Sequence, residues 1–175
     1  MTGEVNRLTF DEVVESSERR LLRVALMLSG GVHSAEDLVQ TVLARAYWQW
    51  GRIGSLDHPE AYLRTMVVNE FLSWRRRLKN RELPIAEFDE TVATDDFSSR
   101  QAERDATWRL LAELPRRQRA VLVLRYYEDL PDDEIASILG CSASTVRSNA
   151  ARGLAGLRAN LAARDEELWD DEPNR

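Results

Sequence analysis

The sequence contains a single cysteine, Cys141, and only two histidines, His33 and His58. One thiol excludes an intramolecular disulfide and indicates a reducing compartment. These three side chains cannot supply the tetrahedral ligand set of a zinc site, so we expect no metal. No apolar run approaches the roughly 20 residues that span a bilayer, and the first residues lack the basic and apolar stretches of a signal peptide. We therefore expect a cytosolic protein without a cofactor.

Signatures of catalysis are also missing from the 175 residues. The chain has no Gly-rich phosphate loop, and no histidine lies near a serine or cysteine in a repeated, polar setting. The carboxylates fall at expected helix caps or in an acidic connecting segment. An enzyme is therefore not expected.

The net charge of −6 argues against a nucleic-acid partner, but the charges are unevenly distributed. Residues 1–80 hold 11 basic and 10 acidic side chains, and residues 101–163 hold 9 and 8, whereas residues 81–100 and 164–175 each hold 2 and 6. No acid lies between Glu70 and Glu82, and none lies between Glu134 and Asp165. Because a polyanion responds to the local field, these two acid-free windows predict two basic surfaces.

Every periodic segment of the sequence favours a helix, and no strand pattern is present. Thr9 and Glu12 have capping-box spacing for a first helix that ends at Gly30-Gly31. Ser34, three residues before Asp37, is expected to open a second helix that ends near Gly51. Pro59 is expected in the first turn of a third helix that ends near Lys79.

A second helical group follows an acidic segment without a period. Its four expected helices cover residues 101–114, 115–127, 132–139 and 143 to about 164, with a frayed tail beyond. The predicted fold is all-α, with two small helical domains joined by a flexible linker. The predicted divisions are a first domain at 8–80, the linker at 81–101, a second domain at 102–164 and an acidic tail at 165–175.

Residues 132–158 have the pattern of a helix-turn-helix. Gly140 occupies the turn, where a left-handed residue is needed, and Ser142 can cap the second helix. The periodicity predicts a buried stripe of Val146, Ala150, Leu154, Leu157 and Leu161. The opposite face carries arginines and small residues without an acid, which suits the major groove: Ser144, Arg147, Ser148, Ala151, Arg152 and Ala155. Asn149 flanks that face and either reads adenine or is an ordinary polar helix residue.

Two helices of the first half carry a second face besides the buried one. In the segment 35–50, the stripe of Val39, Val42, Leu43, Ala46 and Trp50 is expected to be buried. The opposite face has an exposed tryptophan that favours a protein interface or, alternatively, packs within its own domain: Asp37, Gln40, Thr41, Ala44 and Trp48. In the segment 59–79, one stripe suits unpaired bases or is simply solvated: Tyr62, Met66, Asn69, Ser73, Arg76 and Arg77.

These segments resemble the extracytoplasmic-function (ECF) sigma factors of the sigma-70 superfamily, most closely the actinobacterial branch. SAEDLVQTVLARAYWQW resembles region 2.2, and DHPEAYLRTMVVNEFLSWRRR resembles regions 2.3 and 2.4. LAELPRRQRAVLVLRYYEDLPDDEIASILGCSASTVRSNAARGLAGLR resembles region 4. The resemblance covers about residues 10–80 and 103–160.

The resemblance implies the following roles. Asp37, Gln40, Thr41, Ala44 and Trp48 would bind core RNA polymerase. The loop 51–58 and the stripe Tyr62, Met66, Asn69, Ser73, Arg76 and Arg77 would capture flipped bases of the non-template −10 strand. Ser144, Arg147, Ser148, Ala151 and Arg152 would read the −35 duplex. The acidic linker would pass through a polymerase channel, and an anti-sigma factor is a further partner that the family allows.

The sequence departs from the family pattern in three places. The family often has Asp at the position of Ser73 and an Arg-Leu pair at the position of Asn149-Ala150, and the acidic tail lies outside the shared pattern. Two alternatives stay open. One is a free-standing helix-turn-helix regulator that binds a palindrome as a dimer, and the other is a sigma-like interaction module without DNA binding.

Overall fold

The computed structural model describes the backbone of residues 8–80 and 108–170, and the side chains of residues 8–73 and 108–163. The described residues form helices joined by short turns and loops, with no strand among them. The chain divides into two compact units, Met1–Val92 and Ala93–Arg175. The predicted linker 81–101 lies outside the described residues.

The first helix, α1 (Phe10–Ser29), begins and ends as the sequence predicts. The backbone N–H of Glu12 donates to the Thr9 hydroxyl, and the backbone N–H of Thr9 donates to the Glu12 carboxylate at 2.7 Å. The Thr9 hydroxyl also donates to the Glu12 carboxylate at 2.8 Å, and the hydrogen bonds that this carboxylate accepts from the Thr9 backbone and side chain lower the pKa of Glu12. Gly30 ends the helix with a left-handed backbone at φ 81°. Both expectations for this helix are confirmed.

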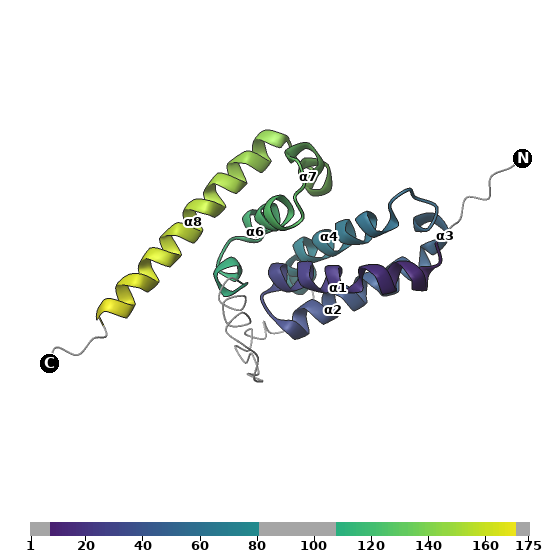
Figure 1. The fold of residues 1–175 in the computed structure, drawn as a ribbon, viewed down its shortest axis with the longest axis horizontal. Coiled ribbons are helices and arrows are strands. Elements are labelled where there is room, and N and C mark those ends of the chain that lie inside the picture. Colours follow the sequence, from purple (N-terminus) through teal and green to yellow (C-terminus); the bar gives the residue numbers. More distant parts are fainter. Residues whose placement is uncertain (1–7, 81–107, 171–175) are drawn as a thin grey trace, which may run out of the picture. The chain divides into compact units, whose positions relative to one another are not determined.

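Three long helices pack against one another in the N-terminal unit: α1, α2 (Val32–Trp48) and α4 (Pro59–Asn80). Figure 1 shows them side by side, with the short helix α3 (Trp50–Ile53) between α2 and α4. The helices bury one apolar stripe each, as their periodicity requires. The fully buried side chains include Val24 and Leu28 of α1, Val42 of α2, and Leu63 and Phe71 of α4.

Two details of this unit differ from the sequence-based expectation. Helix α2 begins at Val32 with Gly31 as its cap, and no side chain caps it, so the expected role of Ser34 is wrong. The predicted second helix also divides at Gln49, where the backbone turns before α3. Trp50 therefore belongs to α3 and is half-buried, as is Leu43, rather than fully in the core stripe.

The C-terminal unit contains a helical turn at residues 108–112, then α6 (Arg116–Leu122), the π-helical segment η1 (Val123–Tyr127), α7 (Asp132–Leu139) and α8 (Ala143–Asp170). Helix α8 packs on α6 and α7, and Figure 1 shows it running well past both. The core is built from Leu124, Ile135, Val146 and their neighbours. The expected helix 115–127 changes to π-helical pairing at Val123, where Glu128 N–H donates to the Val123 carbonyl.

Close helix packing in this unit depends on glycine. A Cβ on Gly153 of α8 would lie 3.0 Å from Leu122 Cδ1, and one on Gly156 would lie 2.9 Å from Leu114 Cδ2. Leu114 and Leu122 are both buried, so these glycines let α8 approach the helices beneath it. Farther along α8, the expectation for Leu161 is wrong, because its side chain is 47% exposed. The helical backbone also continues to Asp170, beyond the helix end expected at about residue 164.

Arg119 of α6 is buried although it lies in an arginine-rich segment. Its Nη2 atom donates to the carbonyl of Ala112, the last residue of the helical turn at 108–112, and to that of Leu114 at 3.0 Å, just after the turn. Burial, together with repulsion from Arg116, lowers the pKa of Arg119 to about 10, so it remains charged at neutral pH. Arg119 thus links two helical segments and is not part of a basic surface.

Candidate protein and nucleic-acid interfaces

The outer face of α2 is exposed where the sequence predicts a protein interface. Asp37, Gln40, Ala44 and Trp48 are exposed, and Thr41 is half-buried. The Trp48 side chain is 86% exposed, which excludes its alternative placement in the core of its own unit. Val39, Val42 and Ala46 are buried on the opposite side of the helix and hold this face outward.

An aromatic group lies next to this face. Tyr47 contacts Trp48 edge to face, with ring centroids 6.3 Å apart, and Phe10 contacts both Tyr47 and Trp50 in the same way. Such pairs fix the ring positions at the end of α2. Trp48 is therefore a large apolar surface presented from an ordered helix end, which is typical of a binding hot spot.

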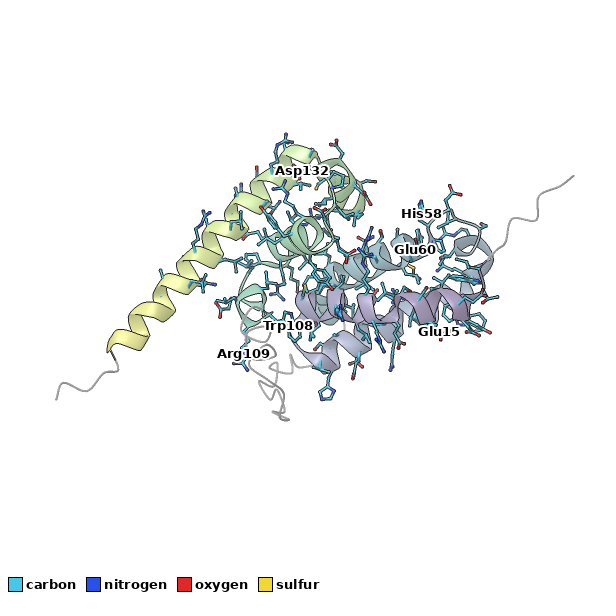
Figure 2. The ribbon with its side chains drawn as sticks, viewed as in Figure 1. Glu15, His58, Glu60, Trp108, Arg109 and Asp132 are labelled. Atoms are coloured by element: carbon cyan, nitrogen blue, oxygen red, sulfur yellow. The ribbon has the colours of Figure 1, made fainter. Side chains whose placement is uncertain are left out.

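Helix α3 is tied to the first turns of α4 by Arg52. Its Nη2 atom donates to the Tyr62 hydroxyl at 2.8 Å and to Gln49 Oε1 at 2.9 Å. The guanidinium carbon also lies 5.4 Å from the centre of the Tyr62 ring. His58 and Glu60, labelled in Figure 2, lie at the start of α4 with Nδ1 and Oε1 3.6 Å apart. The sequence pattern did not identify Arg52 as a partner of Tyr62.

The predicted base-binding stripe of α4 follows this loop. Asn69 is exposed, while Tyr62, Met66 and Ser73 are half-buried. The Ser73 hydroxyl donates to the backbone carbonyl of Glu70 at 3.1 Å, so it bonds within its own helix. The side chains of Arg76 and Arg77 lie outside those that the structure describes. Among the described side chains, the stripe therefore presents the Tyr62 ring, the Met66 thioether and the Asn69 amide.

The helix-turn-helix has the expected local geometry. Gly140 is left-handed at φ 61°, and the backbone N–H of Thr145 donates to the Ser142 hydroxyl at 3.2 Å. Val146 and Ala150 are buried, and Leu154 and Leu157 are half-buried. Every member of the predicted outer face is exposed: Ser144, Arg147, Ser148, Ala151, Arg152 and Ala155. No acid belongs to this face, so its field favours a polyanion.

Two polar side chains near this face have partners that the sequence did not reveal. Asn149 is half-buried, and its Nδ2 atom donates to the Thr145 carbonyl at 2.8 Å, which favours the ordinary helix role over base reading. Asp132, labelled in Figure 2, is the first residue of α7. Its Oδ1 atom accepts a hydrogen bond from Arg125, and its Oδ2 atom lies 3.8 Å from Nη1 of Arg147. The hydrogen bond from Arg125 to Asp132 raises the pKa of Arg125.

Within the described residues, no group of three or more His, Cys, Asp or Glu side chains is placed to hold a metal ion. Among those residues, no helix has both the length and the apolar character needed to cross a membrane. In the described part of the chain, the candidate binding surfaces are the exposed faces of α2, α4 and α8.

Residues 13–81 match the protein family described as Sigma-70 region 2, and residues 104–157 match the one described as Sigma-70, region 4. The chain is 40% identical over 163 residues to RNA polymerase sigma-E factor of Streptomyces coelicolor, covering 93% of this chain and 90% of that protein. It is 32% identical over 146 residues to ECF RNA polymerase sigma factor SigL of Mycobacterium tuberculosis, covering 81% and 82% of the two chains.

Solved structures agree with these matches. The sigma factor RpoE of Bartonella quintana, in complex with the anti-sigma factor NepR, is similar with a TM-score of 0.69 and 27% identity, covering 87% of this chain and 96% of that one. CnrH, in complex with the cytosolic domain of CnrY, has a TM-score of 0.60 at 22% identity and supports the fold alone. The chain therefore belongs to the ECF sigma factors of the sigma-70 family, with region 2 in its N-terminal unit and region 4 in its C-terminal unit.

Proposed function

We propose that this chain binds core RNA polymerase in the cytoplasm and directs it to promoters, without catalysing a reaction itself. The outer face of α2 binds the polymerase, the stripe of α4 captures bases of the −10 strand, and the outer face of α8 reads the −35 duplex. One observation carries the proposal: Trp48 and Arg147 are exposed on helices of different units, each opposite a buried apolar stripe. One chain can therefore contact a protein and DNA at the same time.

Each surface has the chemistry that its partner needs. A desolvated tryptophan is among the strongest contributors to protein–protein affinity. The Tyr62 ring and the Asn69 amide can stack on and hydrogen-bond to an unpaired base. On α8, small side chains at Ser148 and Ala151 leave room for the helix in the major groove, beside arginines that bind guanine or phosphate.

The domain divisions remain part of this proposal. We assign polymerase binding and −10 recognition to residues 8–80, −35 recognition to residues 102–164, and a connecting role to residues 81–101. We assign no promoter contact to residues 165–175. Since RpoE of Bartonella quintana is described in complex with an anti-sigma factor, we include an anti-sigma factor among the partners.

The experiment that tests this function is transcription in vitro from a pool of templates with randomised −35 and −10 segments. Core polymerase of Streptomyces coelicolor is supplied with or without the purified chain, and the templates of the transcripts are sequenced. We expect the chain to enrich a −35 and a −10 sequence at a fixed spacing. Enrichment of no template would contradict the proposal. A free-standing regulator would instead bind a palindromic duplex tightly without the polymerase.

A further inference from the structure

Asp132 lies between two arginines that come from different elements of the C-terminal unit. Arg125 belongs to η1 and Arg147 belongs to the outer face of α8. From this arrangement we propose that Asp132 is a positioning residue, which directs the Arg147 guanidinium at its base in the −35 duplex. The inference deepens the proposed function, on which it depends, by naming a residue that sets −35 specificity without touching DNA.

The Asp132 carboxylate is held in place before DNA is present. Its Oδ1 atom accepts the hydrogen bond from Arg125 Nη2, and the side chains of both residues are only 24% exposed. A half-buried, charge-assisted hydrogen bond is stronger than one between neutral groups and limits side-chain rotation. Asp132 is also the first residue of α7, so its backbone position is fixed by the helix. The second oxygen, Oδ2, is therefore a fixed negative charge.

Arg147 is the group on which that charge acts. Its Nη1 atom lies 3.8 Å from Asp132 Oδ2, which is too long for a direct hydrogen bond but within the range of an ion pair, whose attraction solvent partly screens. The Arg147 side chain is 63% exposed, so most of its N–H groups stay available. An arginine side chain loses about 2 kcal/mol of rotamer entropy when it is fixed. A nearby carboxylate that limits the Arg147 side chain to few rotamers before DNA binds reduces this entropy cost. It also favours one orientation of the guanidinium toward the base.

Arg152 provides an internal comparison on the same face of α8. It is exposed like Arg147, but it has no ion pair with any residue in the described part of the chain. An unrestrained arginine suits a phosphate, which accepts hydrogen bonds from many directions. A restrained arginine suits a guanine, whose two acceptors lie at fixed positions in the major groove. We therefore assign base reading to Arg147 and phosphate binding to Arg152.

Asp133 supplies a matched control for Asp132. It is the next residue of α7, carries the same charge, is exposed, and has no ion pair with a described residue. Both carboxylates lie in the first turn, where they interact similarly with the helix dipole and add the same long-range repulsion toward DNA. Only Asp132 contacts Arg147, so a difference between the two variants isolates the positioning effect.

The test repeats the selection from randomised −35 segments with polymerase carrying one of five chains. These are the unchanged chain, Asp132→Asn, Asp133→Asn, Arg147→Ala and the double variant Asp132→Asn/Arg147→Ala. We expect Arg147→Ala to relax base preference at one or two −35 positions by roughly tenfold, within the range of one arginine–guanine contact. Asp132→Asn should relax the base preference at the same positions by about threefold or more, because it removes part of the contribution of the Arg147–guanine contact. Asp133→Asn should leave them unchanged.

The double variant distinguishes positioning from a structural role. If Asp132 acts through Arg147, the double variant has the preference of Arg147→Ala alone. A preference in Asp132→Asn that matches the unchanged chain, or an added change in the double variant, would overturn the inference. If Arg147→Ala itself alters no −35 preference, the proposed function of this face fails instead, and the two failures are thus distinguishable.

A second variant covers the case in which Asp132→Asn does not fold, which its circular dichroism would reveal. Asp132→Glu keeps the charge and the dipole interaction but moves the carboxylate by one methylene. We expect a folded chain whose preference changes at the positions that Arg147 reads. An unchanged preference in folded Asp132→Glu would contradict the inference.

Discussion

Arg45 of α2 forms an ion pair with Glu70 of α4, through Nη1 and Oε2. The Glu70 side chain is only 10% exposed, whereas Arg45 is 43% exposed, so a partly solvated arginine neutralises a nearly buried carboxylate. The pair joins the helix that we assign to polymerase binding to the helix that we assign to −10 recognition. It therefore holds the two surfaces of region 2 in a fixed relation.

We expect Arg45→Ala to destabilise the N-terminal unit by about 1–3 kcal/mol, the usual cost of losing a hydrogen bond to a charged, buried group. Hydrogen exchange of the α2 and α4 amides should become faster, because the two helices separate more readily. Arg23→Ala is the control, since Arg23 is exposed on α1 and has no ion pair with a described residue. Equal exchange in both variants would show that the pair does not hold the helices together.

We expect Tyr62→Ala to weaken binding of a single-stranded −10 oligonucleotide by about 1–3 kcal/mol, the usual contribution of one stacked base. The measurement is fluorescence anisotropy of a labelled oligonucleotide with the chain bound to core polymerase. Tyr127→Ala is the control, because Tyr127 is an exposed tyrosine of η1 in the C-terminal unit, outside the α4 stripe and the α2 face. The same affinity for both variants would remove Tyr62 from the −10 site.

We expect Arg152→Ala to weaken promoter binding about equally for all −35 sequences, because a phosphate contact carries no sequence information. The slope of the logarithm of the binding constant against that of the salt concentration should fall by about 1. A filter-binding titration at several salt concentrations measures both quantities. A change in base preference with an unchanged slope would assign Arg152 to a base instead.

We expect Gly153→Ala to lower the melting temperature, although alanine is the better helix former by about 1 kcal/mol. The new Cβ would lie 3.0 Å and 3.2 Å from two atoms of the buried Leu122, and overpacking typically costs about 1–3 kcal/mol. Gly51→Ala is the control, since a Cβ there has no neighbour within 4 Å. It should leave the melting temperature equal or higher. A stabilised Gly153→Ala would show that Leu122 moves aside easily.

Local signals in the sequence predicted the parts of the fold that local chemistry controls. Thr9 with Glu12, Gly30, Gly140 and Ser142 each mark a helix end through a hydrogen bond or a left-handed backbone within four residues. The exposed faces of α2 and α8 also followed from periodicity, because a helix with one apolar stripe must turn the opposite side outward. These features required no knowledge of distant contacts.

The remaining features depend on groups far apart in the sequence. Arg45 and Glu70 are 25 residues apart, and Arg147 meets Asp132 only because α7 and α8 pack together. The burial of Arg119 could not be predicted, because it follows three polar residues, Arg116, Arg117 and Gln118. Composition does not reveal which of these arginines faces the preceding helix. The change to π-helical pairing at Val123 likewise has no signal in the hydrophobic periodicity, which predicts one continuous helix there.

The central claim is that α2 binds the polymerase while α8 reads DNA, and Trp48→Ala tests it most directly. Affinity for fluorescently labelled core polymerase is measured for this variant, for Arg147→Ala and for the unchanged chain, with circular dichroism to confirm the fold. We predict that Trp48→Ala lowers the affinity by roughly thirtyfold, as expected for a hot-spot tryptophan, and that Arg147→Ala leaves it unchanged. Unchanged affinity in Trp48→Ala, or lost affinity in Arg147→Ala, would contradict the account.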